Sequence, residues 1–552
     1  MHTLIKSPLA SLLILSAPQL ALTAAPVEVT HAKGEGIELK LLPDEHWWGG
    51  LSVDGHYMPY TKDTELQRNL YGTNLGNQAN PILVSSQGRY IWSEMPYRYT
   101  FSNGTLHIDE TLGEVFVGQA GSTLSEGFLA AAQKYFPSTG EIPEPLLFTR
   151  PQYNTWIELM YNQNEADILR YAFAILSHGY PPGVLMIDDN WQVNYGDWRF
   201  SRERFTNPKL MIELLQESGF QVMMWICPFV TADSEVFRYT AAEGILHLDP
   251  QRTQEILWAN TRNMAAIVRW WNGASGLLDL SNPRARDWFK AQMDHLVEEY
   301  GVDGFKLDAG DTNFYRGVIS YDEDTIPNDH TRFFAEMGLD YPLNEYRATW
   351  KLAGQPLAQR LRDKGHEWED LEQLIPGMLA LGLMGYAYAC PDMIGGGQYN
   401  SFLQAETIDQ ELIVRSAQVH ALMPMMQFSV APWRVLSPEK NAICRQMAQL
   451  HADFGEEILE LAKRSSRTGE PIVKPLAWQW PNQGYEAIQD QFMLGDTVLV
   501  APVIEAGARS REVHFPPGTW VGDDGSQVVG PTVVEIEVPL SRLPYYRLQE
   551  GS

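Results

Sequence analysis

The pattern of apolar and polar positions divides the chain into three parts. Residues 26–145 contain short runs of alternating apolar and polar residues separated by glycines and polar turns, which predicts an antiparallel β-sandwich. Between residues 146 and 466, apolar runs of strand length alternate with amphipathic helical stretches. From residue 467 to residue 552 the strand-like runs return, and they predict a second β-domain, also a β-sandwich, of ordinary domain size.

The middle part predicts a (β/α)8 barrel, or TIM barrel. Repeated alternation of strand and helix over one long stretch favours a barrel over an open sheet. We expect strands at 156–159, 184–187, 221–226, 304–308, 346–350, 385–389 and 425–430, with helices at 167–178, 210–218, 289–300 and 371–382. Residues 311–339 do not fit this repeat, and we interpret them as a loop insertion near the site.

Polar residues gather where the predicted strands end, namely Asp188, Asp189, Asp308, Arg347 and Asp392. The active sites of such barrels are built at the carboxyl ends of the strands. We therefore expect these side chains to meet at one rim of the barrel.

The stretch 301–311, Gly-Val-Asp-Gly-Phe-Lys-Leu-Asp-Ala-Gly-Asp, contains an unusual pair of charges. Side chains alternate along a strand, so Lys306 and Asp308 point to the same side. A nearby ammonium favours the ionised carboxylate and lowers its pKa, as a carboxylate nucleophile requires at neutral pH. A structural ion pair at a strand end would give the same pattern, and this stretch alone leaves both interpretations open.

A second carboxyl group is needed for one specific chemistry. A retaining glycosidase uses two carboxyl groups about 5–5.5 Å apart, one ionised as nucleophile and one protonated as acid. The acid should come from another strand end, where its environment keeps its pKa higher. Asp363, in the polar stretch Arg-Asp-Lys, is the candidate, although such a stretch is by itself typical of a solvated loop.

Several motifs in this order resemble glycoside hydrolase family 31. The segment from Lys306 to Asp311 resembles the nucleophile motif of members that carry Lys-x-Asp-x-Gly-acid, and Asp363 lies five residues before Trp368, the spacing of the acid/base residue of the family. Other segments that match are Arg347 with Ala353-Gly354-Gln355, Pro391-Asp392-Met393-Ile394-Gly395-Gly396, Trp271-Asn272-Gly273, Asp279-Leu280-Ser281-Asn282-Pro283 and Gln491 to Val503. The resemblance implies a β-sandwich, a barrel and a C-terminal β-region, and no cofactor.

The resemblance also implies a role for each matching residue. Asp308 would be the nucleophile and Asp363 the acid/base residue. The implied substrate-binding residues are Asp188 and Asp189 at the innermost sugar hydroxyls, Lys306 holding Asp308 and a hydroxyl, Arg347 holding hydroxyls or Asp363, Trp191 and Trp271 as stacking platforms or core residues, and Asp392 as a weaker ligand candidate.

The sequence lacks the Ser of the Ala-Gly-Ser-Gln segment of the family, and it departs from the commonest pattern around both implied catalytic residues. The acid/base residue lies in Arg362-Asp363-Lys364 instead of Gly-Asp-Asn, and the nucleophile in Asp308-Ala309-Gly310-Asp311 instead of Asp-Met-Asn-Glu. Both departures resemble the branch that contains bacterial α-galactosidases and the animal myogenesis-regulating glycosidase. We therefore expect an exo-acting α-galactosidase, with α-glucosidase and α-xylosidase as the alternatives within the family.

Composition agrees with a neutral sugar as ligand. The formal net charge of the 552-residue chain is −28, with the acidic residues spread along it, which argues against nucleic acid or an anionic membrane as a partner. The 17 Trp, 24 Tyr and 21 Phe supply flat faces that suit the sugar rings of an oligosaccharide or glycoside, although aromatic residues are more often core.

Two other classes of protein are weighed against this one. A catalytically inactive sugar-binding protein is disfavoured because both carboxylate positions are filled. A metal-dependent hydrolase would need clustered histidines at strand ends, whereas the 13 histidines are scattered and the motif His-x-His is absent from the sequence. We expect no metal and no cofactor in catalysis.

The first residues have the pattern of a signal peptide. A short positive start is followed by an apolar stretch and then by small residues before a polar chain, which predicts a removable segment at 1–25. We therefore expect an exported protein, periplasmic or secreted.

Overall fold

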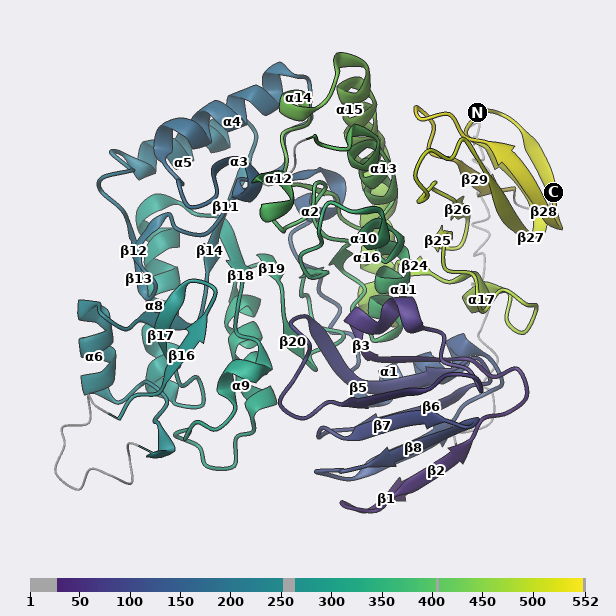
Figure 1. Cartoon of the computed structure of the whole chain (residues 1–552), viewed down its shortest axis with the longest axis horizontal. Coiled ribbons are helices and arrows are strands. Elements are labelled where there is room, and N and C mark those ends of the chain that lie inside the picture. Colours follow the sequence, from purple (N-terminus) through teal and green to yellow (C-terminus); the bar gives the residue numbers. More distant parts are fainter. Residues whose placement is uncertain (1–26, 252–263, 404–406, 550–552) are drawn as a thin grey trace, which may run out of the picture.

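The computed structural model describes residues 27–251, 264–403 and 407–549 (Figure 1). The predicted signal peptide lies outside the described residues. Among the helices that the structure describes, none is both long enough and apolar enough to cross a membrane.

The middle of the chain forms the predicted barrel. Its eight parallel strands are β10 (Gln152–Asn154), β11 (Val184–Ile187), β14 (Gln221–Ile226), β18 (Gly304–Leu307), β19 (Leu343–Tyr346), β21 (Gln359–Arg360), β22 (Ala389–Cys390) and β23 (Gln427–Phe428). They are hydrogen-bonded in chain order from β10 to β22, and β23 pairs with β10. A parallel bridge between Ile394 and Phe428 connects the two ends of this series.

Helices surround the barrel strands (Figure 1). They include α4 (Glu165–Ser177), α5 (Pro208–Glu217), α8 (Pro283–Tyr300), α9 (Pro327–Met337), α11 (Leu374–Leu383), α13 (Gln410–Ala421), α15 (Pro438–Asp453) and α16 (Gly455–Thr468). Helices α4, α5 and α15 each begin at an Asn or Ser whose side-chain oxygen accepts a backbone N–H of the first turn, which satisfies one free donor of the helix end.

Three predictions within the barrel are wrong. The predicted strand 385–389 overlaps β22 only at Ala389, because the chain turns after α11 and enters the strand later. Residues 156–159 form helix α3 (Trp156–Leu159), directly after the first strand, because a short apolar run has no periodicity that separates helix from strand. Residues 311–339 are not simply a loop, because they contain the 3-10 helix η3 (Thr312–Tyr315) and the connecting helix α9. The buried face of α9 includes Asn328, His330 and Thr331, so its apolar periodicity is weak.

The N-terminal part forms the predicted β-sandwich. One sheet contains β1 (Val27–His31), β9 (Val115–Gln119), β6 (Arg89–Ser93), β5 (Gln78–Ser85) and β3 (Trp47–Leu51), and the other contains β2 (Ile37–Lys40), β8 (Thr105–Asp109), β7 (Arg98–Ser102) and β4 (Leu66–Asn69). The predicted strand 346–350 divides between two sheets. Its second half, β20 (Thr349–Trp350), leaves the barrel and pairs with β5, so the sandwich and the barrel are joined by backbone hydrogen bonds.

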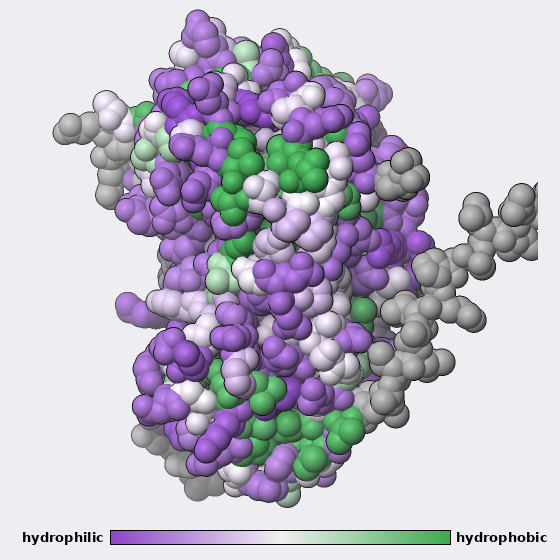
Figure 2. Space-filling model, turned by 90° about the vertical axis from the view of Figure 1, so that its right-hand side faces the viewer, coloured by the Kyte–Doolittle hydropathy of each residue, from purple (hydrophilic) through white to green (hydrophobic). Residues whose placement is uncertain are grey.

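The C-terminal part forms a six-stranded antiparallel sheet. Its strands are β24 (Val473–Lys474), β25 (Phe492–Leu494), β26 (Val498–Val500), β29 (Tyr545–Leu548), β27 (Ser510–Gly522) and β28 (Gln527–Glu537). Phe515, Trp520 and Tyr546 belong to its own small core. Figure 2 shows the side of the molecule that carries this sheet above and the sandwich below, with a mostly hydrophilic surface and separate apolar patches.

Gly304 sets the spacing between the strand that leads to Asp308 and its neighbour. A Cβ atom at this position would lie 1.8 Å from the backbone oxygen of Leu343 on β19. We expect Gly304→Ala to force the two strands apart and to lower the free energy of unfolding by about 3 kcal/mol or more, since overpacking a tight core costs 1–3 kcal/mol and occasionally more.

Gly36→Ala is the matched control, because nothing lies within 4 Å of a Cβ built at Gly36 and the backbone there carries no strain that favours glycine. Denaturant unfolding of both variants makes the test. Equal stability of the two variants would contradict the close strand approach.

Candidate active site

A cavity of about 320 Å³ opens at the carboxyl ends of the barrel strands. All of the predicted site residues line it except two, and those that do are Asp188, Asp189, Trp271, Lys306, Asp308, Arg347 and Asp363. Its walls also include Trp156, Tyr161, Trp225 and the segment 397–400. The cavity therefore combines carboxylates, cations and aromatic faces, which is a suitable lining for a polar ring with hydroxyl groups.

Asp308, directly after β18, is held as an anion. Its carboxylate accepts hydrogen bonds from the indole N–H of Trp225 and the backbone N–H of Ala309, both at 2.8 Å, and a guanidinium nitrogen of Arg347 lies 3.5 Å away. Burial raises the pKa of Asp308, but Arg347, Lys306 and Arg360, with the indole bond, outweigh it and hold the pKa at about 2. An ionised, partly exposed carboxylate has the state that a nucleophile needs.

Lys306 has a different partner from the one expected. Its ammonium lies 2.7 Å from a carboxylate oxygen of Asp188, and both side chains are almost completely buried. Strand alternation correctly places Lys306 on the same side as Asp308, but the direct ion pair is formed with the end of β11. Lys306 therefore acts on Asp308 through its charge rather than by holding it.

Arg347, directly after β19, lies between two carboxylates. Its guanidinium is 3.5 Å from Asp308 and 3.7 Å from Asp311, and it stacks on the ring of Trp271 at 4.7 Å. The ring of Trp271 is 46% exposed, so one face remains open to a ligand. Arg347 thus positions both Asp308 and the aromatic wall, and it is not the residue that holds Asp363.

Asp363 is held by Arg360 instead. A guanidinium nitrogen of Arg360 donates to Asp363 and to Asp392, each at 2.8 Å, and a second nitrogen lies 3.1 Å from Glu345. Asp392 is 1% exposed and is not among the described residues that line the cavity, so its prediction as a sugar ligand is wrong. Its carboxylate also accepts the backbone N–H of Lys364, and it orients Arg360 from behind.

The pKa of Asp363 differs from the expectation for an acid. Burial raises the pKa, but the charges of Arg360, Arg347 and Lys306 outweigh it and hold the pKa below its ordinary value. The negative charge of Asp308 acts in the opposite direction. A reaction that neutralises Asp308 therefore lowers the pKa of Asp363 further, and in the free site both groups are carboxylates.

Among the carboxyl groups that line the described cavity, Asp189 has a pKa shifted in the opposite direction. Burial and the neighbouring charge of Asp188 raise its pKa to about 7, although Tyr195 and Asn272 donate hydrogen bonds to it. Near neutral pH this carboxyl group is present in both forms. A protonated carboxyl group donates and accepts hydrogen bonds, so Asp189 can donate a hydrogen bond to a sugar hydroxyl or accept one from it.

Trp191 is a core residue and not a stacking platform. Its ring is completely buried, its N–H donates to the backbone oxygen of Trp225 at 2.9 Å, and it packs against Trp198 and Phe200. It does not occur among the described residues of the cavity wall. It supports the strand that carries Trp225.

Several residues that hold the site together were not predicted from the sequence. Arg360 lies three positions before Asp363, and Trp225 is the one aromatic residue in the otherwise aliphatic and polar strand β14. A buried indole N–H needs a hydrogen-bond partner, so a Trp in a buried strand could have indicated that Trp225 bonds a polar group of the site. The amides of Asn77 and Gln78, from the sandwich, donate to the backbone oxygens of Arg347 and Arg360 at 2.7–3.1 Å. Sequence spacing could not indicate this contact.

Comparison with known proteins places the chain in a family. Residues 145–360 match the glycosyl hydrolases family 31 TIM-barrel domain, and residues 469–552 match the glycosyl hydrolase family 31 C-terminal domain. Together the two matches cover more than half of the chain. This chain belongs to glycoside hydrolase family 31.

Among its relatives within the family, the myogenesis-regulating glycosidase of Mus musculus is 33% identical over 399 residues, which are 70% of this chain and 54% of that protein. Alpha-glucosidase 2 of Bacillus thermoamyloliquefaciens is 24% identical over 513 residues, 84% of this chain and 62% of that protein. The chain thus spans about half to three fifths of the length of these relatives.

Solved structures of the family share the fold. A GH31 dextranase of Flavobacterium johnsoniae complexed with glucose superposes with a TM-score of 0.79 at 18% identity, over 93% of this chain and 66% of that chain. A GH31 alpha-xylosidase from a soil metagenome complexed with xylose gives a TM-score of 0.77 at 20% identity, over 94% and 79%. The predicted fold class is confirmed.

The two predicted tryptophan platforms can be separated by experiment. We expect Trp191→Ala to lower the free energy of unfolding by about 3–5 kcal/mol, as for other buried aromatic residues. Trp271→Ala should change the free energy of unfolding by no more than about 0.5 kcal/mol. It should weaken ligand binding about tenfold, since an exposed aromatic face contributes to stacking on a sugar ring.

Denaturant unfolding measures the change in stability. Calorimetric titration with the free sugar that binds most tightly measures the change in affinity. A loss of stability in the Trp271 variant without a loss of affinity would contradict the assignment of its ring to the ligand.

Proposed function

We propose that this protein is a retaining exo-α-glycosidase that uses two aspartates in a double displacement. The observation that carries the proposal is the ionised carboxylate of Asp308, in one cavity with Asp363, held by Trp225 and Arg347. Attack of Asp308 on the anomeric carbon would expel the leaving oxygen and form a covalent glycosyl intermediate. Water would then resolve this intermediate with net retention.

Asp363 would have two roles in this sequence. It would first donate a proton to the leaving oxygen and then accept one from the attacking water. Glycosylation of Asp308 removes its negative charge, which lowers the pKa of Asp363 and favours the base form when the second step needs it. Because the pKa of Asp363 is low in the free site, the base form is favoured over the acid form. The first step therefore requires an acidic pH, at which Asp363 carries the proton that it donates.

For the sugar we propose an α-galactoside. The support is the resemblance of the two catalytic motifs to the α-galactosidase branch and the 33% identity to a myogenesis-regulating glycosidase. An α-glucosidase or α-xylosidase is the second candidate, because the relatives include proteins named alpha-glucosidase and 1,3-alpha-isomaltosidase. The substrate is a neutral oligosaccharide or glycoside, and neither nucleic acid nor a membrane is required.

The choice of sugar can be tested with para-nitrophenyl α-galactoside, α-glucoside and α-xyloside. We expect the highest kcat/KM for the galactoside and retention of the anomeric configuration in the first-formed product by NMR. A preference for the glucoside or the xyloside would refute the proposed galactose specificity and leave the proposed mechanism unchanged. A first-formed product with inverted anomeric configuration would refute the mechanism.

The role of Asp308 predicts rescue by a small anion. Asp308→Ala should abolish turnover, with a loss of at least about 10³-fold, because removal of a nucleophile eliminates the covalent step. Added azide should restore part of the rate by attacking from the vacated side. The control is Asp303→Ala. Asp303 lies before β18, its carboxylate accepts the backbone N–H of Val222, and it does not belong to the described cavity lining. Full activity of the Asp308 variant would contradict the assignment.

The role of Asp363 predicts a dependence on the leaving group. Because the pKa of Asp363 is lowered, its proton-donating form is lost as pH rises through the acid range. Alkyl glycosides need that proton, so their kcat/KM should fall with rising pH, while dinitrophenyl glycosides need none and should remain active. Asp363→Ala should abolish this difference by reducing mainly the alkyl rate, and identical pH profiles for both substrates would contradict an acid role.

A further inference from the structure

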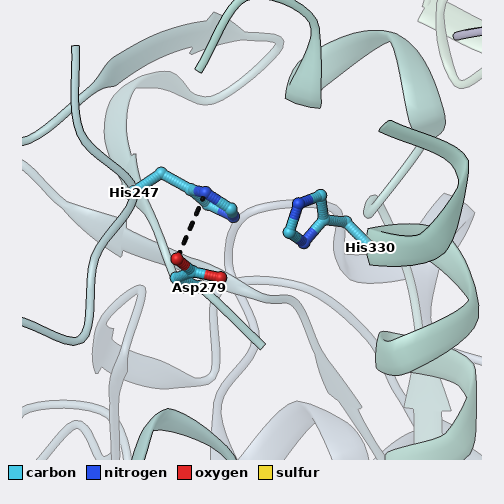
Figure 3. Close-up of side chains that lie close together, drawn as sticks. All are labelled: His247, Asp279 and His330. Atoms are coloured by element: carbon cyan, nitrogen blue, oxygen red, sulfur yellow. Dashed lines mark ion pairs between the residues drawn. The ribbon is translucent and has the colours of Figure 1, made fainter. Parts of the chain in front are cut away.

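A buried cluster of two histidines and one aspartate lies outside the catalytic cavity. His247 lies beside the end of β17 (Gly273–Leu277), Asp279 follows that strand, and His330 belongs to α9. Figure 3 shows the two rings and the carboxylate turned toward one another. The three side chains are at most 3% exposed, and one ligand atom from each lies within 4.8 Å of the other two.

One nitrogen of each ring has a polar neighbour. His247 Nδ1 lies 3.4 Å from the backbone oxygen of Ile319 and 3.7 Å from a carboxylate oxygen of Asp279, and His330 Nε2 lies 2.9 Å from the hydroxyl of Ser320. These contacts place the ring protons at His247 Nδ1 and His330 Nε2 when each ring is the donor. The other two nitrogens, His247 Nε2 and His330 Nδ1, then carry free lone pairs.

His247 Nε2 and His330 Nδ1 are buried without a hydrogen-bond partner in the part of the chain that the structure describes. A buried polar atom left unpaired costs about 1–3 kcal/mol, so two in one cluster need an explanation. The rings contact each other edge to face at 4.3 Å, which does not satisfy a lone pair.

We propose that His247, Asp279 and His330 bind one divalent transition-metal ion of the zinc class. Two imidazole nitrogens and one carboxylate oxygen are a ligand set of borderline Lewis acids such as Zn²⁺, and not of Ca²⁺ or Mg²⁺, which prefer oxygen. Bond lengths of about 2.0–2.2 Å in a tetrahedral site put the ligand atoms about 3.4 Å apart, so atoms that now lie up to 4.8 Å apart would approach one another by up to about 1.4 Å on binding.

An outer shell of hydrogen bonds orients the ligands. Asp279 accepts the backbone N–H of Tyr321 and the backbone and hydroxyl protons of Ser281, while Ile319 and Ser320 orient the rings. Such partners fix the tautomer and direction of metal ligands. The segment 319–321 therefore contacts all three residues and would be fixed by the ion.

The ion would stabilise the loop after the nucleophile and would not take part in the reaction. No residue of the cluster occurs in the described lining of the cavity. His330 stacks on Tyr315 of η3, and the hydroxyl of the next residue of α9, Thr331, donates to the backbone oxygen of Gly310 at 2.7 Å. The cluster thus connects to the loop that carries Asp311, and the proposal does not depend on the choice of sugar.

The test uses the full chain, stripped with a chelator and titrated with Zn²⁺ or Co²⁺. We expect one ion per chain by elemental analysis, visible Co²⁺ absorption typical of nitrogen and oxygen ligands, and a melting temperature raised by several degrees through mass action. Absence of stoichiometric uptake, or uptake with an unchanged melting temperature, would overturn the proposal.

Variants assign the uptake to the cluster. His247→Gln and His330→Gln should each remove the Co²⁺ absorption and the shift in melting temperature. His451→Gln is the matched control, since His451 is equally buried, bonds a backbone oxygen through Nδ1 and has an unpartnered Nε2 among the described residues, but lies outside the cluster. If both cluster variants bind as the control does, the proposal is wrong. If they fail to fold, Asp279→Asn provides the same comparison.

Discussion

The compensation of buried charges inside the barrel is the constraint on which the site depends. Three cations lie among the carboxylates at the carboxyl ends of the strands, namely Lys306, Arg347 and Arg360. Lys306 contacts Asp188, Arg347 contacts Asp308, and Arg360 contacts Glu345 and Asp363. An isolated buried charge would cost several kcal/mol or neutralise itself, so every member is tolerable only because of its partners. This division of partners explains the opposite pKa shifts of Asp308 and Asp189, since Asp308 has cations on several sides while Asp189 lies beside another carboxylate.

The same constraint connects the N-terminal sandwich to the candidate active site. Arg347 and Arg360 occupy fixed positions partly because Asn77 and Gln78 bond their backbone oxygens, and because β20 extends the sheet of the sandwich. An arginine that lowers a carboxylate pKa must keep its distance, since a shift of one unit corresponds to 1.36 kcal/mol. The sandwich is therefore part of the electrostatic framework of the site, although neither Asp308 nor Asp363 belongs to it.

Much of the fold and part of the site could be predicted from the sequence. The strands at 184–187 and 221–226 have the predicted bounds, because their apolar runs are long and bounded by turn residues. Strand alternation placed Lys306 and Asp308 on one side. It could not identify Asp188 as the partner of Lys306, since the partner lies two strands away in the barrel. Arg360, helix α9 and the His247 cluster were missed for a related reason. Each depends on polar groups that are buried by tertiary contacts, and local periodicity carries no signal for them.

The proposed mechanism depends most directly on a covalent bond between Asp308 and the sugar. Incubation with a 2-deoxy-2-fluoro glycosyl fluoride of the preferred sugar slows the second step and traps that bond, and mass spectrometry of the digested protein locates it. We expect one label per chain, on the peptide that contains Asp308. A label on Asp311 or Asp363, or turnover without any covalent species, would contradict this mechanism.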